Sequence, residues 1–412
     1  MNITTKTNQL VLALIVSFFS ILMACKSKEE PAPINQPPGN FNITSTLSTN
    51  GQDVILKWTK SKDPDGDIVT YSVVYNDTLT RNLSDTTYTI KNLPFETEIK
   101  GSVVAKDTKG SKTVSNFNVK TGADYVLIPD ANFEKWLIAL KIDDVSDGKV
   151  LKSSVLKVTS LNVSDTSNDN IDPINSLTGI EAFINLETLW FSKNLVKSID
   201  ISKNIALSSI RCWSNQLTSL DISKNIKLTD LYCFENQLSQ LDISQNTALI
   251  LVQIDKNKLT TLDVSKNIAL AGLTCQGNQL TTLDMSKNIN LQLLRCNNNQ
   301  LKNLDVSKNT NLTILDCFTN KLSSIDISKN NKLIELYCHE NLITNLDLTQ
   351  NTLLEILLCN NNSLNELDIK KNLKVTSLFC NNNKIQTICV NNLSQVKTTW
   401  QKDLTATYKV CP

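Results

Sequence analysis

Length, composition and charge already exclude several classes of protein. The chain has 412 residues, which is enough for about two to three domains of ordinary size. Its 41 Lys and Arg residues against 40 Asp and Glu give a net charge of +1, so the electrostatic attraction that nucleic-acid binding needs is absent. One histidine, His339, and 10 glycines without a GxGxxG or GxxxxGK spacing disfavour catalytic triads, zinc sites and phosphate-binding loops. The sequence therefore predicts a non-catalytic binding protein with no cofactor, no metal and no nucleic-acid partner.

Residues 1–24 have the pattern of an export signal. One positive charge, Lys6, precedes an apolar run over residues 10–24 that is short for a membrane-spanning helix. The run ends in Leu-Met-Ala-Cys at residues 22–25, which resembles the lipobox of bacterial lipoproteins. The resemblance implies that the signal peptide is removed and that the thiol of Cys25 carries the lipid that anchors the protein to the membrane.

Residues 25–39 have the composition of a flexible tether. The segment KSKEEPAPINQPPG, residues 26–39, is charged and rich in proline, so it cannot bury a core of its own. Lys28, followed by two acidic residues, resembles the surface-export signal of Bacteroidetes lipoproteins. We therefore expect a lipid-anchored protein of the bacterial cell envelope, located in the outer membrane and exposed at the surface.

Residues 40–121 alternate polar and apolar side chains in short runs. The apolar members are Val54, Leu56 and Trp58, then Tyr71, Val73 and Tyr75, then Tyr88 and Ile90, then Val103 and Ala105, then Phe117 and Val119. A period of two between turn signals predicts an antiparallel β-sandwich. The early Trp58, the DPDGD turn at 63–67 and the AKD at 105–107 resemble a bacterial fibronectin type III domain, which we expect to act as a spacer. We expect a plain polar turn at 63–67, because the Gly and Glu positions of an EF-type calcium loop are not matched.

A 21-residue period runs through the rest of the chain. Eight cysteines fall on this spacing, with Phe191 and Ile254 at the two remaining positions; they are Cys212, Cys233, Cys275, Cys296, Cys317, Cys338, Cys359 and Cys380. Each period holds two LxxLxΦxxN half-motifs that end in asparagine, the first from Asn194 to Asn383 and the second from Asn204 to Asn372. One unit cannot bury its apolar face alone, so the units must stack into a solenoid.

This pattern resembles the bacterial leucine-rich repeat family over residues 186–383, and in particular the cysteine-ladder repeats of the internalin J type. The resemblance implies a mostly β fold, with a solenoid whose strands form one parallel sheet. Residues 122–185 resemble the helical amino-terminal cap of such proteins, and residues 384–412, where the period is lost, are expected to form the carboxyl-terminal cap.

The predicted amino-terminal cap contains an amphipathic helix and a first half-turn of the solenoid. The helix is expected over residues 128–142, with Phe133, Trp136, Leu137 and Leu140 on one face, and the half-turn over residues 158–164. Together they close the exposed end of the sheet.

The cysteines on the period are interpreted as a buried ladder of small apolar side chains. Stacked turns about 4.8 Å apart hold these side chains parallel, and Phe191 and Ile254 show that the position accepts apolar residues, which disfavours a metal or redox role. Cys389 and Cys411 lie off the period, in the cap, and the predicted compartment is oxidising. We therefore expect a disulfide between Cys389 and Cys411.

A second column is formed by acidic residues in the second half of each unit. Aspartate recurs there from Asp200 to Asp368, and lysine or glutamine recurs three residues later, from Lys203 to Lys371. Nine stacked carboxylates repel one another, so we expect the lysines to bridge neighbouring turns and neutralise the column. The alternative is a cation-binding stripe.

Aromatic residues give the functional signal. In the repeats, every aromatic residue except Phe191 flanks the ladder position and is expected to point outward from the strand. In the leucine-rich repeat family this strand lines the concave, ligand-facing sheet. The resemblance thus implies a binding surface made of Trp190, Arg211, Trp213, Tyr232, Phe234, Arg295, Asp316, Phe318, Tyr337, His339 and Phe379. Apolar surface exposed so regularly marks binding sites, whereas scattered aromatics stacked on neighbouring strands are the alternative.

We expect this surface to bind a protein, in an adhesion-like role at the cell surface. A glycan ligand is the first alternative, because Trp and Tyr side chains with flanking amides also suit sugars. An enzyme is the distant third class, since His339 has no second histidine and is expected to make a polar surface contact.

Overall fold

The chain folds into two compact units, Met1–Asp124 and Tyr125–Pro412. The computed structural model describes residues 32–165 and 171–412, so the predicted signal peptide and Cys25 lie outside the described residues. Within those described ranges, no helix combines the length and the apolar character needed to cross a membrane.

The first unit is an antiparallel β-sandwich. One sheet has the order β1-β2-β5, with β1 (Ile43–Leu47), β2 (Val54–Trp58) and β5 (Thr87–Ile90). The other has the order β4-β3-β6-β7, with β3 (Thr70–Tyr75), β4 (Asp77–Leu83), β6 (Glu98–Lys106) and β7 (Lys112–Lys120). The predicted sandwich is thus confirmed.

The alternating apolar residues of the sandwich meet in its core. Tyr71 is 1% exposed, and its ring centroid lies 5.8 Å from that of Phe41 and 5.5 Å from that of Trp58. The Tyr71 hydroxyl oxygen accepts the backbone N–H of Ser61 at 2.7 Å, so the one polar atom of this buried ring is satisfied.

The second unit begins with a cap in which β8 (Tyr125–Leu127) pairs with β9 (Lys149–Leu151), followed by α3 (Lys152–Val155). Between the strands lies α2 (Ala131–Ala139), which is shorter than the predicted 128–142 helix. The carboxylate of Asp130 accepts two N–H groups of the first turn, and the left-handed backbone at Lys141 (φ 59°) ends the helix.

The predicted apolar face of this helix is correct only in part. Phe133 and Leu137 are fully buried and Trp136 packs partly against the core. Leu140 is 41% exposed, because the helix ends one residue before it; its placement on the core face was wrong. Glu134 is buried instead, and its carboxylate accepts the hydroxyl of Ser146 at 2.7 Å and two backbone N–H groups of the same loop.

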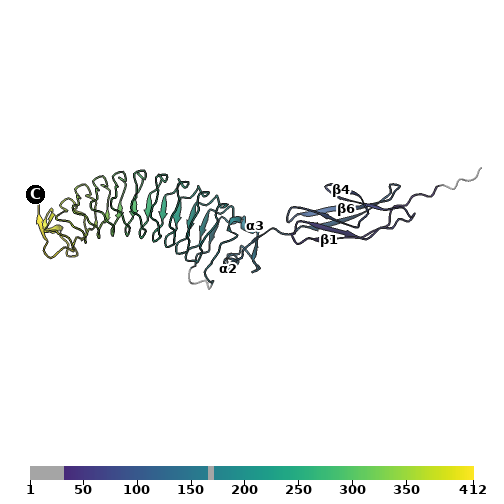
Figure 1. Cartoon of the computed structure of the whole chain (residues 1–412), viewed down its shortest axis with the longest axis horizontal. Helices are drawn as coiled ribbons and strands as arrows, with labels where there is room; N and C mark the ends of the chain where they lie inside the picture. Colours follow the sequence, from purple (N-terminus) through teal and green to yellow (C-terminus); the bar gives the residue numbers. More distant parts are fainter. Residues whose placement is uncertain (1–31, 166–170) are drawn as a thin grey trace, which may run out of the picture. The chain divides into compact units, whose positions relative to one another are not determined.

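The solenoid carries one parallel sheet of eleven short strands, one per turn (Figure 1). The strands are β10 (Ser160–Asn162), β11 (Thr188–Trp190), β12 (Ser209–Arg211), β13 (Asp230–Tyr232), β14 (Leu251–Gln253), β15 (Gly272–Thr274), β16 (Leu293–Arg295), β17 (Ile314–Asp316), β18 (Glu335–Tyr337), β19 (Ile356–Leu358) and β21 (Ser377–Phe379). A short 3-10 helix, η1 (Ile180–Ala182), precedes β11. From β11 to β21 each strand residue pairs with the one 21 positions later, as in Trp190 with Arg211, so equivalent side chains form straight columns.

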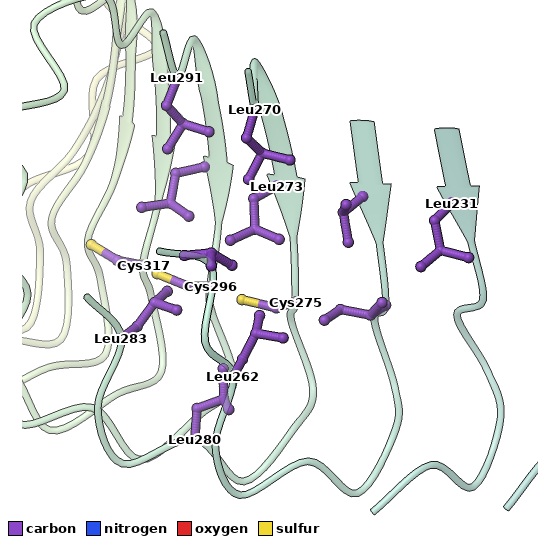
Figure 2. Close-up of a cluster of buried hydrophobic side chains, with 14 of the residues drawn as sticks. Leu231, Leu262, Leu270, Leu273, Cys275, Leu280, Leu283, Leu291, Cys296 and Cys317 are labelled. Atoms are coloured by element: carbon purple, nitrogen blue, oxygen red, sulfur yellow. The ribbon is translucent and has the colours of Figure 1, made fainter. Parts of the chain in front are cut away.

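The ladder column lies inside the solenoid, as predicted. All eight cysteines of the period are buried and unpaired, and Phe191 and Ile254 are buried at the same position. Figure 2 shows the sulfurs of Cys275, Cys296 and Cys317 in line among leucine side chains. Burial raises the pKa of these thiols, to about 12 for Cys338, so they remain neutral and behave as small apolar groups.

The corner asparagines supply hydrogen bonds to the turns of the backbone. The side-chain amide of Asn215 donates to the carbonyl of Phe191 at 2.9 Å, and its Oδ1 accepts the N–H of Val196 at 3.1 Å. At the other corner, the amide of Asn225 donates to the carbonyls of Ile201 and Asn204 at 3.1 and 2.9 Å. Since both corners repeat in every turn, the asparagines tie each turn to the one before it.

The carboxyl-terminal segment continues the coil for one further turn without the repeat motif. Three parallel strands, β20 (Leu367–Asp368), β22 (Thr387–Val390) and β23 (Thr407–Val410), stack around η2 (Leu393–Gln395). The backbone carbonyl of Gln401 accepts the N–H of Cys380 at 2.9 Å, and Gln401 thereby covers the last strand of the main sheet. Cys389 and Cys411 form a disulfide, with their Cα atoms 5.4 Å apart.

Candidate functional site

The open face of the solenoid sheet carries all eleven residues that the sequence selected. We define the open face as the third residue of each strand and the residue two positions later, which both point away from the core. Trp190, Arg211, Tyr232, Arg295, Asp316, Tyr337 and Phe379 are third residues of their strands, and Trp213, Phe234, Phe318 and His339 follow two positions later. Strand alternation produces this arrangement, because the residue between each pair is the buried ladder position.

The first cluster on the open face lies on strands β11 to β13. The guanidinium carbon of Arg211 lies 4.1 Å from the ring centroid of Trp190 and 5.2 Å from that of Tyr232, so the cation is held between two aromatic rings. Beside it, the rings of Trp213 and Phe234 stack with centroids 5.3 Å apart and an interplanar angle of 5°. We call these five residues the aromatic patch.

Two nitrogens of the aromatic patch have no hydrogen-bond partner. They are Nε of Arg211 and Nε1 of Trp190, both shielded from solvent. At the edge of the patch, Glu235 accepts the ammonium group of Lys256 at 2.6 Å and the hydroxyl of Ser214, and these bonds hold the pKa of Glu235 below its usual range. The patch therefore offers apolar surface and unused donors side by side, which is the composition of a binding hot spot.

A polar sector follows on β14 to β17. Asp255, Thr274, Asn297 and Asp316 are each at most 9% exposed, although they belong to the outer face of the sheet. Asp255 accepts the hydroxyl of Thr274 at 2.7 Å and the N–H of Gln276 at 2.9 Å. Asp255, Thr274, Gln276 and Arg295 line part of a hollow of about 270 Å³. The sequence analysis selected Arg295 and Asp316 but missed Asp255, Thr274 and Asn297. These three could have been found from their spacing, because they lie on the same columns as Trp213 and Tyr232.

Burial shifts the acid groups of this sector. It raises the pKa of Asp316 to about 6, against the opposing effects of the positive charge of Arg295 and the N–H of Phe318. It also raises the pKa of Asp255, although the bonds from Thr274 and Gln276 oppose the change. The carboxyl groups of Asp316 and Asp255 are therefore protonated closer to neutral pH than they would be at the exposed surface.

A second aromatic cluster lies on β17 and β18. The rings of Phe318 and His339 stack with centroids 4.3 Å apart, and the hydroxyl of Tyr337 donates to Glu335 at 2.9 Å. Burial lowers the pKa of His339. Phe379 lies apart from this cluster, because β19 separates its strand from β18.

The aspartate column lies on a different part of the turn and is stabilised locally. Each carboxylate accepts the backbone N–H two residues later, as Asp284 does from Ser286 at 2.8 Å, and for Asp284 this bond is the main cause of its lowered pKa. Among the described residues, lysine bridges to neighbouring turns are not present, contrary to our expectation; the one ion pair of the column, between Lys370 and Asp368, lies within a turn. The short Asx turn already satisfies the carboxylate, so a long lysine side chain gains little by binding it.

Two hollows of the described surface also border the aspartate column. They measure about 590 and 530 Å³ and share Thr261, Leu262 and Asp263. Because the same lining recurs from turn to turn, these hollows are a property of the repeat rather than a site at one place.

One acidic group in the sandwich has side chains close enough to hold a cation, among the residues described. It comprises Asp63, Asp67 and Asp107. Lys109 pairs with Asp67 at 3.0 Å, and Asp107 accepts three backbone N–H groups and the amide of Asn35. Protein groups therefore already bind Asp67 and Asp107, whereas Asp63 accepts two backbone N–H groups through Oδ1 and its buried Oδ2 has no partner.

Comparison with known proteins supports the two-part architecture. Residues 36–118 match the family model of the Fibronectin type III domain. An internalin, InlF, of Listeria monocytogenes aligns with a TM-score of 0.54 and 19% identity over 68% of this chain and 96% of its own. A leucine-rich repeat protein of Leptospira interrogans aligns at 0.51 and 24%, over 56% of this chain and 63% of its own. The functional domain of InlJ from Listeria monocytogenes, described as including a cysteine ladder, aligns at 0.41 and 26%, over 68% of this chain and 81% of its own.

No curated protein matches the sequence. The structural likenesses show the fold: a fibronectin type III sandwich is followed by a leucine-rich repeat solenoid with 21-residue turns, as the sequence predicted.

Proposed function

We propose that this chain is a surface-anchored binding protein that recognises a protein partner through the open face of its solenoid and performs no catalysis. The aromatic patch carries the proposal. It gathers five residues of the types that dominate protein interfaces, Trp, Arg, Tyr and Phe, on three adjacent strands of a rigid sheet.

The geometry of the rings favours a protein over a glycan. One face of Trp213 is stacked on one face of Phe234, and the guanidinium of Arg211 covers one face of Trp190 and one of Tyr232. A sugar ring needs an open aromatic face for stacking, whereas protein side chains pack well against ring edges. The glycan alternative is therefore the weaker one.

The reactive groups of the solenoid favour binding over catalysis. The ladder thiols are buried and neutral, as the raised pKa of Cys359 illustrates, so they cannot act as nucleophiles. His339 is stacked on Phe318, and desolvation lowers its pKa. The non-catalytic role remains part of the proposal.

Binding is tested with the chain from Lys26 to Pro412, immobilised and exposed to extracts of bacterial envelopes and of host cells. We expect capture of a protein that is lost in the double variant Trp213→Ala, Tyr232→Ala and kept in Lys224→Ala. A glycan array is run in parallel. If the wild-type chain binds defined glycans and the double variant does not, the glycan alternative is favoured. Equal capture of protein by the wild type and the double variant would contradict the proposed surface.

The lipid anchor is tested at Cys25. We expect Cys25→Ser to abolish incorporation of a clickable fatty acid, because the lipobox chemistry needs a thiol at this position. Cys296→Ala is the matched control, since its free thiol is buried in the solenoid. Labelling that persists in Cys25→Ser would contradict the anchor.

A further inference from the structure

Two buried acceptor oxygens on neighbouring turns of the polar sector have no donor. Asn297 is 2% exposed and Asp316 is 9% exposed, and Oδ1 of each has no hydrogen-bond partner. Asp316 ends β17, and Asn297 follows β16, whose Arg295 pairs in register with Asp316. Corner asparagines such as Asn288 also have an unpaired Oδ1 atom inside the solenoid, but these two oxygens belong to the open face, where a donor from outside the chain can approach them.

The backbone N–H of Phe318 acts on the carboxyl of Asp316, but Oδ1 is left without a partner, and the neighbouring side chains do not supply one. Arg295 on β16 is exposed, and no ion pair within 4 Å joins it to Asp316 among the described residues. On β18, the hydroxyl of Tyr337 is already donated to Glu335 at 2.9 Å. The carboxylate of Asp255 accepts hydrogen bonds from Thr274 and Gln276 and has no donor to offer. The ring of His339 is stacked on Phe318.

The surroundings favour an organic cation over a metal ion. Asp255 and Asp316 stand three turns apart, roughly 14 Å at about 4.8 Å per turn, so they cannot coordinate the same ion. A guanidinium group has several N–H donors in one plane, which suits two separated acceptors, and it stacks on aromatic rings such as the Phe318–His339 pair.

We propose that Asp316 and Asn297 bind the guanidinium group of an arginine side chain that belongs to the protein partner. This inference rests on the proposed function and adds the chemistry of one contact to it. The arginine donates to Oδ1 of Asp316 and to Oδ1 of Asn297, while the aromatic patch binds an apolar part of the same partner.

Binding of a cation to Asp316 is linked to pH. With a pKa of about 6, the free carboxyl is mostly protonated at pH 5, and a bound guanidinium favours the ionised form, so binding releases a proton. The affinity should therefore rise about tenfold from pH 5 to pH 7 and then level off. His339 acts in the same direction, because its protonated form at low pH repels the ligand.

The only histidine of the chain, His339, makes a direct experiment possible. Its ring protons give isolated proton NMR signals, and the ring lies against Phe318, two residues beyond Asp316. The chain from Lys26 to Pro412 is titrated with N-acetyl-arginine amide, and with the citrulline analogue, which has the same shape and no charge. We expect a saturable shift of the His339 signals with the arginine compound alone.

Variants identify the acceptor. We expect Asp316→Asn to weaken arginine binding about 10–100-fold and to remove most of the pH dependence, and Asn297→Ser to weaken it less. Asp326→Asn, on the aspartate column, is the matched control and should bind as wild type does. If Asp316→Asn does not fold, as judged by its melting temperature, the pH dependence of the wild type and the Asn297→Ser variant still test the contact.

Some results would overturn the inference. An equal response to arginine and citrulline, or unchanged arginine binding in Asp316→Asn, would show that the two oxygens do not form a guanidinium site. Because the probe is a small molecule, this outcome is independent of whether the natural partner is captured. If the wild-type chain binds the arginine compound but captures no protein from the extracts, the result would instead count against the proposed function.

Discussion

The inner and outer columns of the same solenoid sheet follow opposite rules. Inside, cysteine recurs at the ladder position in eight turns and asparagine at every corner. Outside, the third strand residue changes at almost every turn, from Trp190 and Arg211 through Thr274 to Asp316 and Phe379. An inner side chain must fit the equivalent side chains of the turns before and after it, so the turns constrain one another to one residue type. An outer side chain has no such constraint and is available for recognition.

The largest test of the inner column uses its thiols. Burial raises their pKa above the ordinary value of 9.0, to about 12 for Cys338 and Cys380, so the folded chain keeps protons that the unfolded chain loses at alkaline pH. The stabilisation is complete below pH 9 and is lost as the pH rises toward the folded values. Well above pH 9 the limiting slope is about 1.4 kcal/mol per pH unit for each thiol, so between pH 8 and 10 the eight together lower the free energy of unfolding by roughly 11 kcal/mol. Urea unfolding followed by circular dichroism between pH 8 and 10.5 measures this slope.

A double variant separates the thiols from other alkaline groups. Cys275→Val with Cys317→Val should reduce the slope by about a quarter, because Ile254 shows that a branched apolar side chain fits the column. A stability that does not change between pH 8 and 10 would contradict the buried, neutral ladder.

The corner asparagines give the next largest effect. The amide of Asn288 donates to the carbonyls of Val264 and Asn267 at 3.1 and 2.9 Å, and the residue is fully buried. Asn288→Ala removes both of these buried hydrogen bonds and leaves a cavity, although each carbonyl keeps one backbone N–H, from Asn267 and Leu270; it should reduce the free energy of unfolding by about 2–4 kcal/mol. Asn290→Ala is the control: its amide also donates to a carbonyl, that of Ile268, but at the surface, so its loss should cost less than about 0.5 kcal/mol. Equal effects of the two substitutions in urea unfolding would show that the corner is not essential.

The inner columns could be predicted from the sequence because their rule repeats. The period of 21, the ladder and the corner asparagines each recur many times, so Phe191 and Ile254 could be placed although they are not cysteines. The ends of the solenoid could be predicted only in outline. Leu140 was misplaced because the sequence did not show where α2 ends, and the extra turn through Gln401 is held by backbone bonds that need no motif.

On the open face, sequence predicted positions but not partners. Strand alternation placed Arg211 outward, yet its location between Trp190 and Tyr232 depends on side-chain rotamers that no periodicity encodes. The buried polar residues Asp255 and Asn297 were missed because polar residues on an outer column are expected to be solvated.

A substitution on the open face should separate binding from stability. If the partner binds the aromatic patch, Trp213→Ala should weaken binding by about 2–4 kcal/mol, because it removes a central aromatic contact, and leave the melting temperature nearly unchanged. Lys224→Ala, beside the aspartate column, should change neither quantity. Binding by calorimetry and melting by circular dichroism make the comparison, and unfolding of Trp213→Ala would show that this side chain stabilises the fold instead.

The smallest change tests whether the ladder needs an apolar atom or only a small one. Cys296 is fully buried, and serine has nearly its size, so Cys296→Ser alters polarity without leaving a large cavity. We expect a loss of about 1–3 kcal/mol in the free energy of unfolding, because the hydroxyl is buried without an assured partner, and a smaller loss for Cys296→Ala. Alkylation followed by mass spectrometry gives an independent measurement: the eight ladder thiols should react only after denaturation, whereas Cys389 and Cys411 should not react until they are reduced. Ready labelling of Cys296 in the native protein would contradict its burial. A larger loss of stability with alanine than with serine would mean that volume rather than polarity governs the inner column.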